Sequence, residues 1–164
     1  MTMAGKPTAS HILSIATLAL LVVTPRAQAG ELGAFLTLPA PTKAWGKGFG
    51  FHAAVISLPF LQAGGEFARM KGENPLVSIE TYTAQVELNP PSVKISPFVG
   101  IGVGAYRQKF GTQSDWGSVN AVFGGVRIPI GAARLRAEFR KIGLSGNPRV
   151  KMDKRFSLGI SFRF

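Results

Sequence analysis

The chain has 164 residues and a hydrophobic content of 46%, which suffices for one folded domain and argues against disorder. Charged residues make up only 16%, and 20 glycines and 11 prolines interrupt the chain too often for a bundle of long helices. The net charge is +11, and the absence of cysteine excludes disulfides, thiolate metal sites and cysteine nucleophiles.

Residues 1–29 have the organisation of a cleaved signal peptide. Lys6 lies in a polar start, and an apolar run follows at 12–23, too short to span a bilayer as a helix. Ala27-Gln28-Ala29 supplies the small-x-small pattern of a signal peptidase site, so we predict cleavage after Ala29. The alternative is a short buried helix, which does not need this order of charged, apolar and small residues. The mature domain, 30–164, remains basic.

The mature domain alternates apolar and polar side chains with the period of two that is typical of β-strands. In chain order the alternation predicts strands at residues 31–38, 48–58, 61–70, 77–88, 94–106, 117–130, 133–142 and 154–164. The segment 31–38 is the most ambiguous, because it is apolar on both parities. An even number of strands of about 9 to 11 residues is typical of barrels that cross a bacterial outer membrane.

The connections between these strands differ in length. Those at 59–60, 89–91 and 131–132 are short, whereas those at 39–47, 71–76, 107–116 and 143–153 are longer. If both termini lie in the periplasm, the short turns lie there too and the longer loops face outside. This is the asymmetry of outer membrane barrels.

The last strand has the clearest alternation, with large apolar residues on one parity and small or polar residues on the other. The apolar set is Phe156, Leu158, Ile160, Phe162 and Phe164. A soluble sandwich would bury this face, whereas an outer membrane barrel would turn it towards lipid. At least five strands carry large apolar side chains on one parity opposite Arg, Glu, Gln, Ser and Gly, which a water-soluble barrel does not tolerate on its outside.

The predicted fold class is therefore all-β, an eight-stranded antiparallel up-and-down transmembrane β-barrel. The alternative is a soluble periplasmic binding barrel of the lipocalin type, which would also alternate and carry a signal peptide. Its outer face should be polar.

Charged residues on one strand face predict a polar lumen. In the segment 133–142, Leu135 and Phe139 share one face and four charged side chains share the other. Glu66, Glu80 and Glu87 are the carboxylates available to pair with guanidinium groups inside the barrel. Glu87 is preferred to Glu80, because the two have opposite parities and Glu87 shares its face with Thr and Gln side chains. The predicted lumen network is Arg127, Arg134, Arg136, Glu138, Arg140 and Glu87.

Three stretches carry a resemblance to a known family: SPFVGIGVGAY at 96–106, FGGVR at 123–127 running into RAEFR at 136–140, and the terminal strand ending at Phe164. The mature chain resembles the opacity-protein-like outer membrane β-barrel family. The resemblance implies a place in the outer membrane and assembly by the barrel-assembly machinery. The implied assembly signal is Phe156, Leu158, Ile160, Phe162 and Phe164.

The sequence predicts no enzyme and no cofactor. His52 lies on the predicted lumen face and would be a general base in a lipid A deacylase or acyltransferase, but no His-x-Ser motif follows it, so a hydrogen-bonded lumen histidine is preferred. The glycines at 100, 102 and 104 lack the spacing of a dinucleotide-binding loop. The acidic residues are too scattered for a metal site.

The predicted role is structural or surface-interacting, because the interior of an eight-stranded barrel is only wide enough for side chains to fill. The alternative is a narrow anion-favouring channel. Basic residues of the predicted outer loops are expected to contact lipopolysaccharide phosphates, the alternative being a solvated rim. They are Lys43, Lys47, Lys71, Arg107, Lys109, Arg149 and Lys151. No nucleic acid partner is expected for an exported chain, and the oligomeric state is not predicted.

Overall fold

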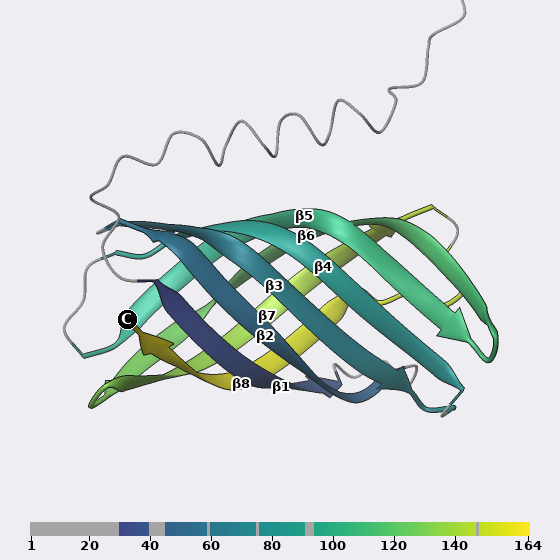
Figure 1. The fold of residues 1–164 in the computed structure, drawn as a ribbon, viewed down its shortest axis with the longest axis horizontal. Helices are drawn as coiled ribbons and strands as arrows, with labels where there is room; N and C mark the ends of the chain where they lie inside the picture. Colours follow the sequence, from purple (N-terminus) through teal and green to yellow (C-terminus); the bar gives the residue numbers. More distant parts are fainter. Residues whose placement is uncertain (1–29, 40–44, 59, 75, 91–93, 147) are drawn as a thin grey trace, which may run out of the picture.

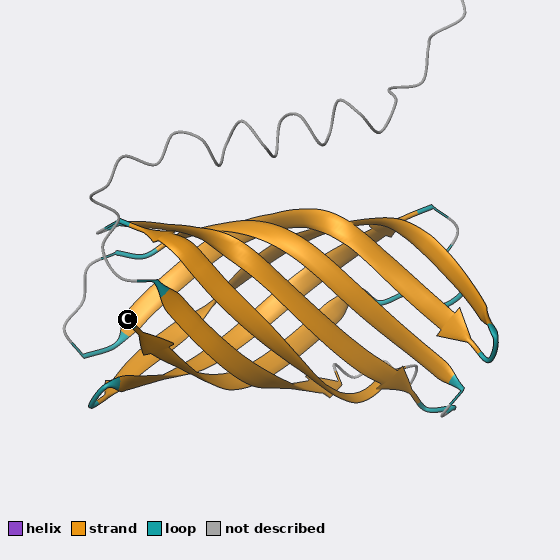
Figure 2. Ribbon diagram, viewed as in Figure 1, coloured by secondary structure: helices purple, strands orange, loops and turns teal. Residues whose placement is uncertain are grey.

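The computed structural model describes residues 30–39, 45–58, 60–74, 76–90, 94–146 and 148–164. These residues form a closed barrel in which each strand is antiparallel to its neighbours and β1 pairs with β8 (Figures 1 and 2). The strands are β1 (Glu31–Pro39), β2 (Trp45–Ser57), β3 (Leu61–Gly72), β4 (Val77–Leu88), β5 (Ser96–Phe110), β6 (Gln113–Ile130), β7 (Ala133–Ser145) and β8 (Lys154–Arg163). The predicted fold class is confirmed, whereas the predicted signal peptide lies outside the described residues.

The barrel has two distinct ends. Glu31 begins the first strand and Arg163 ends the last, so both lie at one end, here named the terminal end. The opposite end, named the loop end, holds the connections 111–112 and 146–153. Among the described residues there is no helix that is long and apolar enough to cross a membrane.

The prediction of a long loop at 107–116 is wrong. β5 continues to Phe110 and β6 begins at Gln113, so only two residues join them, and Gly111 has the positive φ of 59° that such a tight hairpin requires. The ladder continues because its hydrogen bonds do not depend on whether the outward side chains are apolar. Only the apolar pattern, and not the strand, ends near Tyr106.

The two faces of the sheet have opposite polarity. Large apolar side chains point outward from the strands, and in every strand except β3 some are exposed, with Leu36 at 65% and Val103 at 63% exposure. The inward face of the same strands carries buried charged and polar groups. In β1, whose sequence is ambiguous, Glu31 and Phe35 are buried inside and Leu36 faces out.

An apolar cluster, here named the plug, fills the lumen at the loop end. Its buried members are Trp45, Met70, Ile79, Tyr106, Val119, Ala121, Ile142 and Met152. Residues 148–153 of the connection between β7 and β8 close over it: Gln108 Nε2 donates to the Val150 carbonyl oxygen at 2.6 Å, and Trp45 Nε1 donates to the Lys151 carbonyl oxygen at 3.1 Å. Because the connection leaves β7 and is bonded to β2 and β5, it reaches across the mouth of the barrel.

Inward aromatic rings rest on glycines of the neighbouring strand. Gly100 of β5 lies opposite Phe123 of β6, and Phe98 lies opposite Gly125 in the same pair of strands. A Cβ atom added to Gly100 would lie 2.5 Å from Phe123 Cζ and 2.6 Å from the Val86 carbonyl oxygen. The glycine is therefore required by a close approach of ring and backbone.

We expect the substitution Gly100→Ala to lower the free energy of unfolding by about 1–3 kcal/mol, because the added methyl group meets a backbone oxygen that cannot move aside. Gly65→Ala is the matched control, since its Cβ would lie 3.6 Å from the nearest atom, the Thr83 carbonyl oxygen. Urea unfolding of the refolded barrel in detergent micelles measures both. Equal losses in the two variants would contradict the close packing at Gly100.

Candidate functional site

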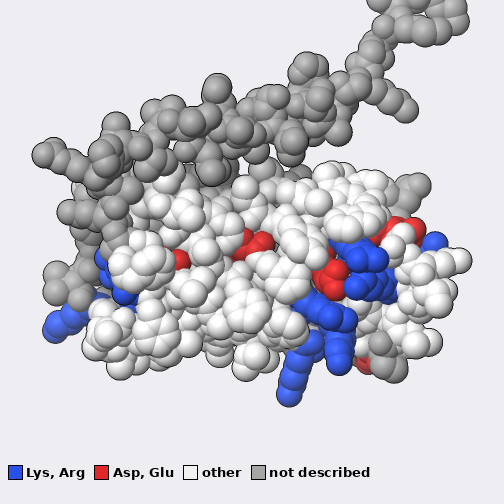
Figure 3. Space-filling model, in the orientation of Figure 1, with Lys and Arg blue, Asp and Glu red and all other residues white. Residues whose placement is uncertain are grey.

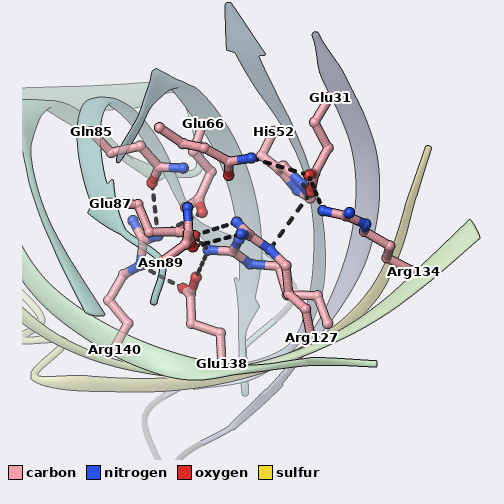
Figure 4. A network of polar contacts seen from close by, with 12 residues as sticks. Glu31, His52, Glu66, Gln85, Glu87, Asn89, Arg127, Arg134, Glu138 and Arg140 are labelled. Atoms are coloured by element: carbon pink, nitrogen blue, oxygen red, sulfur yellow. Dashed lines mark hydrogen bonds and ion pairs between the residues drawn. The ribbon is translucent and has the colours of Figure 1, made fainter. Parts of the chain in front are cut away.

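The lumen between the plug and the terminal end is occupied by an alternating network of acidic and basic side chains, here named the lumen network (Figure 4). Its members are inward-facing residues of seven strands: Glu31 of β1, His52 of β2, Glu66 of β3, Gln85 and Glu87 of β4, Arg127 of β6, Arg134, Arg136, Glu138 and Arg140 of β7, and Arg155 of β8. The period of two explains this convergence, because residues of one parity on every strand meet on the barrel axis.

Glu138 is the centre of the lumen network. Its Oε2 accepts a hydrogen bond from Arg136 Nη2 at 2.6 Å, and its Oε1 accepts one from Arg140 Nε at 2.8 Å. Arg155 Nη2 lies 3.4 Å from the same Oε1 and donates to Glu66 Oε1 at 2.6 Å. Arg140 Nη2 donates to Glu66 Oε2 at 2.8 Å. Two carboxylates and three guanidiniums from β3, β7 and β8 thus share five ionic contacts, and every charge has an opposite neighbour.

A second part of the network continues towards the terminal end. Glu87 contacts both Arg127 and Arg136, the latter at 2.9 Å, which joins it to the Glu138 centre. Glu31 lies 3.7 Å from Arg127 Nε and 3.5 Å from Arg134 Nη1. Opposite charges therefore alternate without interruption from the mouth of the terminal end to the middle of the barrel.

Aromatic rings form the base on which the guanidiniums lie. Arg136 lies 4.0 Å from the centroid of Phe98, and Arg140 lies 4.2 Å from the centroid of Phe123. These are distances at which a planar guanidinium is attracted to a ring face. Each ring packs against the glycine opposite it on the neighbouring strand. From the wall towards the centre of the lumen, the layers are therefore glycine, phenylalanine, arginine and glutamate.

The structure places all six residues of the predicted lumen network on the inward face. Arg134 is the least buried: its side chain is 25% exposed at the terminal end, where it reaches Glu31. Sequence reasoning missed two members, Glu31 and Arg155. Arg155 lies within the predicted last strand and has the parity of Ser157, so assigning it to the small and polar face would have found it. Glu31 was missed because both parities of β1 are apolar.

The basic residues predicted for outer loops are mostly on strands. Lys47 lies on β2, Lys71 on β3, and Arg107 and Lys109 on β5, so their assignment to loops is corrected. The reason is that the strands extend past the apolar pattern at the loop end. Arg149 and Lys151 do lie in the connection 146–153, and Lys43 lies outside the described residues.

Glu80 faces outward and is nevertheless buried, because basic side chains cover it on the outer wall. Lys109 Nζ lies 3.1 Å from its carboxylate and Arg69 Nε lies 3.8 Å from it. Glu80 therefore takes no part in the lumen network, and Glu66 and Glu87 do.

His52 is enclosed at the terminal half of the lumen. Its Nε2 lies 3.5 Å from Glu31 Oε1, and the residue is 4% exposed. The adjacent cavity, lined in part by Gln62, Gln85 and Glu87, has a volume of about 10 Å³, which is room for a single water molecule. Neither an acyl chain nor a sugar fits there. Among the described residues no cluster of three or more His, Asp or Glu side chains is arranged to hold a metal ion.

Comparison with known proteins identifies a fold. No protein-family model matches the sequence, and no curated protein sequence matches it. Among solved structures, the N-terminal β-barrel domain of Pseudomonas aeruginosa OprF superposes with a TM-score of 0.60 at 13% sequence identity, over 84% of this chain and 98% of that domain.

Two further structures have the same architecture. Neisserial surface protein A matches with a TM-score of 0.58 at 17% identity, over 83% of this chain and 96% of that one. Ail, the attachment invasion locus protein of Yersinia pestis, matches with a TM-score of 0.53 at 18% identity, over 83% and 97%. The chain thus has the fold of the small eight-stranded outer membrane β-barrels. Membership of the opacity-protein-like family stays a prediction.

We expect Glu138→Gln to lower the free energy of unfolding by about 3–5 kcal/mol, because it leaves three guanidiniums around a neutral amide in a lumen with little water. Glu73→Gln, in the exposed connection between β3 and β4, removes the same charge and is the control. Urea unfolding in micelles compares the two. A Glu138 variant as stable as the Glu73 variant would show that the lumen is hydrated and the network dispensable.

Proposed function

We propose that this chain is a non-enzymatic integral protein of the bacterial outer membrane, exported by the signal peptide 1–29, with a structural or surface-interaction role. Its barrel is a closed wall that holds the loop end at the cell surface. Large apolar side chains cover the outside of the strands while ionic groups face the lumen, which is the polarity of a protein whose outside is solvated by lipid. The fold shared with OprF, neisserial surface protein A and Ail supports the location.

The proposal that the lumen is blocked rests on one observation: two sets of side chains fill it. The plug and the connection 146–153 occupy the loop end, and the lumen network occupies the rest. The cavity beside His52 has room for one water molecule and is no passage for ions. This filling argues against the narrow anion-favouring channel, and the apolar exterior argues against a soluble lipocalin-like barrel.

The absence of catalysis is part of the proposal. His52, the one histidine of the mature domain, lies inside the lumen beside Glu31 and has no space in front of it for a substrate. A lipid-modifying enzyme needs its general base within reach of a lipid ester or amide outside the barrel. The position of His52 supports a structural contact with the Glu31 carboxylate instead.

Membrane fractionation followed by gel electrophoresis of boiled and unboiled samples tests the location. We expect the protein in the outer membrane fraction, with the unboiled form migrating faster because a closed barrel resists the detergent. A single band in the soluble periplasmic fraction would contradict membrane insertion and restore the soluble binding barrel.

Conductance across a planar lipid bilayer tests closure. We expect no current steps from the inserted barrel, because the side chains of the plug and the lumen network occupy the lumen, while a large general porin in the same bilayer shows steps. Small anion-selective current steps would contradict a blocked lumen and support the narrow anion-favouring channel.

We also propose that Phe164 contributes to an assembly signal. Phe164 N donates to the Gly30 carbonyl oxygen at 3.1 Å, next to the pairing of β1 with β8, and the residue is 78% exposed. We expect deletion of Phe164 to lower the amount of heat-modifiable barrel in the outer membrane severalfold, with little effect from the substitution Leu135→Val at an exposed outward position of β7. Normal assembly without Phe164 would contradict an assembly signal at this position.

A further inference from the structure

We propose that the outer wall of β3, β4 and β5 at the loop end binds the phosphate groups of lipid A, the phosphorylated glycolipid of the outer leaflet. This inference rests on the proposed outer membrane location and adds a specific lipid partner to it. Four outward cations from these strands form the site, here named the cationic wall: Arg69, Lys71, Arg107 and Lys109.

Strand register brings the cationic wall together. Arg69 of β3 lies opposite Glu80 of β4, which lies opposite Arg107 of β5. In the next row towards the loop end, Lys71 and Lys109 lie on either side of Ser78. Adjacent strands are about 4.8 Å apart, so the backbones of β3 and β5 that carry these cations are about 10 Å apart, with β4 between them. Figure 3 shows Lys and Arg atoms gathered around carboxylate atoms towards one end of this face, whereas the middle is mostly uncharged.

The charges of this wall do not cancel. Glu80 is the one carboxylate on the outward face of the described strands β3 to β5, and it contacts Lys109 and Arg69. Neither Lys71 nor Arg107 has a carboxylate partner among the described residues. Lys71 is exposed, and Arg69, Arg107 and Lys109 are half-buried, so ammonium and guanidinium groups of the wall are accessible from outside. The wall thus offers donors in excess of the single carboxylate, which is the condition for binding an added anion.

Aromatic residues give the depth of the cationic wall. Phe67 and Tyr82 lie opposite each other, one outward row closer to the terminal end than Arg69 and Glu80, and their ring centroids are 5.2 Å apart. Trp116 lies opposite Arg107, and its ring centroid is 6.3 Å from that of Tyr82. Arg107 lies over the Trp116 ring at 5.5 Å. Rows of Tyr and Trp mark the boundary between the apolar band of a barrel and the headgroups. Cations on the outer wall at and just beyond that boundary lie at the level of lipid phosphates.

The wall fits a lipid better than a soluble glycan. Its cations project sideways from the strands, next to the apolar band, whereas a glycan would approach the connections at the loop end. A ligand with several phosphates above several acyl chains can contact the four cations and the exposed apolar surface at once. Lipid A has this chemistry.

The test uses the full-length barrel in zwitterionic detergent micelles, titrated calorimetrically with diphosphorylated lipid A. The variant Lys71→Gln/Arg107→Gln removes two cations that form no ion pair with the described residues. The control Lys141→Gln/Lys154→Gln removes two exposed cations that lie opposite each other on β7 and β8, on another part of the wall. Each variant must first show the faster unboiled band, so that loss of folding is recognised.

We expect lipid A to bind the Lys71/Arg107 variant about tenfold more weakly than the wild type, and the control variant within about twofold of it. Removing the phosphates from lipid A should abolish the difference. Unchanged binding by the Lys71/Arg107 variant would overturn the site, and so would equal losses in both variants, which would indicate general attraction by charge. A polysulfated sugar that binds the wild type as tightly as lipid A would indicate a glycan site and overturn the lipid assignment.

Failure of this inference is distinguishable from failure of the proposed function. A barrel that fractionates with the outer membrane and conducts no current, yet binds lipid A equally in all variants, would refute the cationic wall alone. A soluble periplasmic protein would refute both.

Discussion

Pairing of buried charge in the lumen is the constraint on which the rest of the structure depends. The inward face holds the carboxylates of Glu31, Glu66, Glu87 and Glu138 and the guanidiniums of Arg127, Arg136, Arg140 and Arg155, each less than 10% exposed. An unpaired ion in such a place costs several kcal/mol, so each of these groups must meet a partner from another strand. A shift of one residue in any register would turn these ions outward into the apolar band. The network therefore fixes the register of the barrel as well as its interior.

The division of the lumen follows from the same constraint. Arg guanidiniums need both carboxylates and ring faces, and the glycines opposite Phe98 and Phe123 make room for those rings. Nearer the loop end the inward residues change to apolar ones such as Tyr106 and Ile79, which pack together with Met152. Ionic and apolar side chains thus occupy separate lengths of the barrel, and each length is filled in its own way. The connection 146–153 belongs to the apolar part, since it contributes Met152.

Alternation in the sequence predicted the strands, their antiparallel order and the parity of most lumen residues. The segment 77–88 coincides with β4, because its apolar and polar parities are clean from end to end. The prediction failed where the two parities no longer differed as apolar and polar. At 107–116 the outward residues become charged, and the strands continue on backbone hydrogen bonds alone. In β1 the inward Phe35 is as apolar as the outward Leu36, so the sequence did not show on which face Glu31 lies.

The contacts within the network were beyond sequence reasoning. Which carboxylate meets which guanidinium depends on how strands far apart in the chain are staggered around the barrel. Arg140 and Glu66 are separated by 74 positions, yet they share a hydrogen bond of 2.8 Å. A parity pattern identifies the face of a strand and contains no information on stagger. The cationic wall was equally hidden, because its rows become neighbours only through the register of β3, β4 and β5.

The position of Glu31 has a consequence for how the barrel closes. Its partners Arg127, Arg134 and Arg163 lie on the last three strands, whereas Glu31 itself is on the first. An open sheet of eight strands would have β1 and β8 at opposite edges, with the carboxylate far from these cations. The contacts of Glu31 with these three arginines therefore form only when the two edges meet. Closure of the sheet and neutralisation of this charge are one event, which makes the last step of folding cooperative and a partly closed barrel unstable.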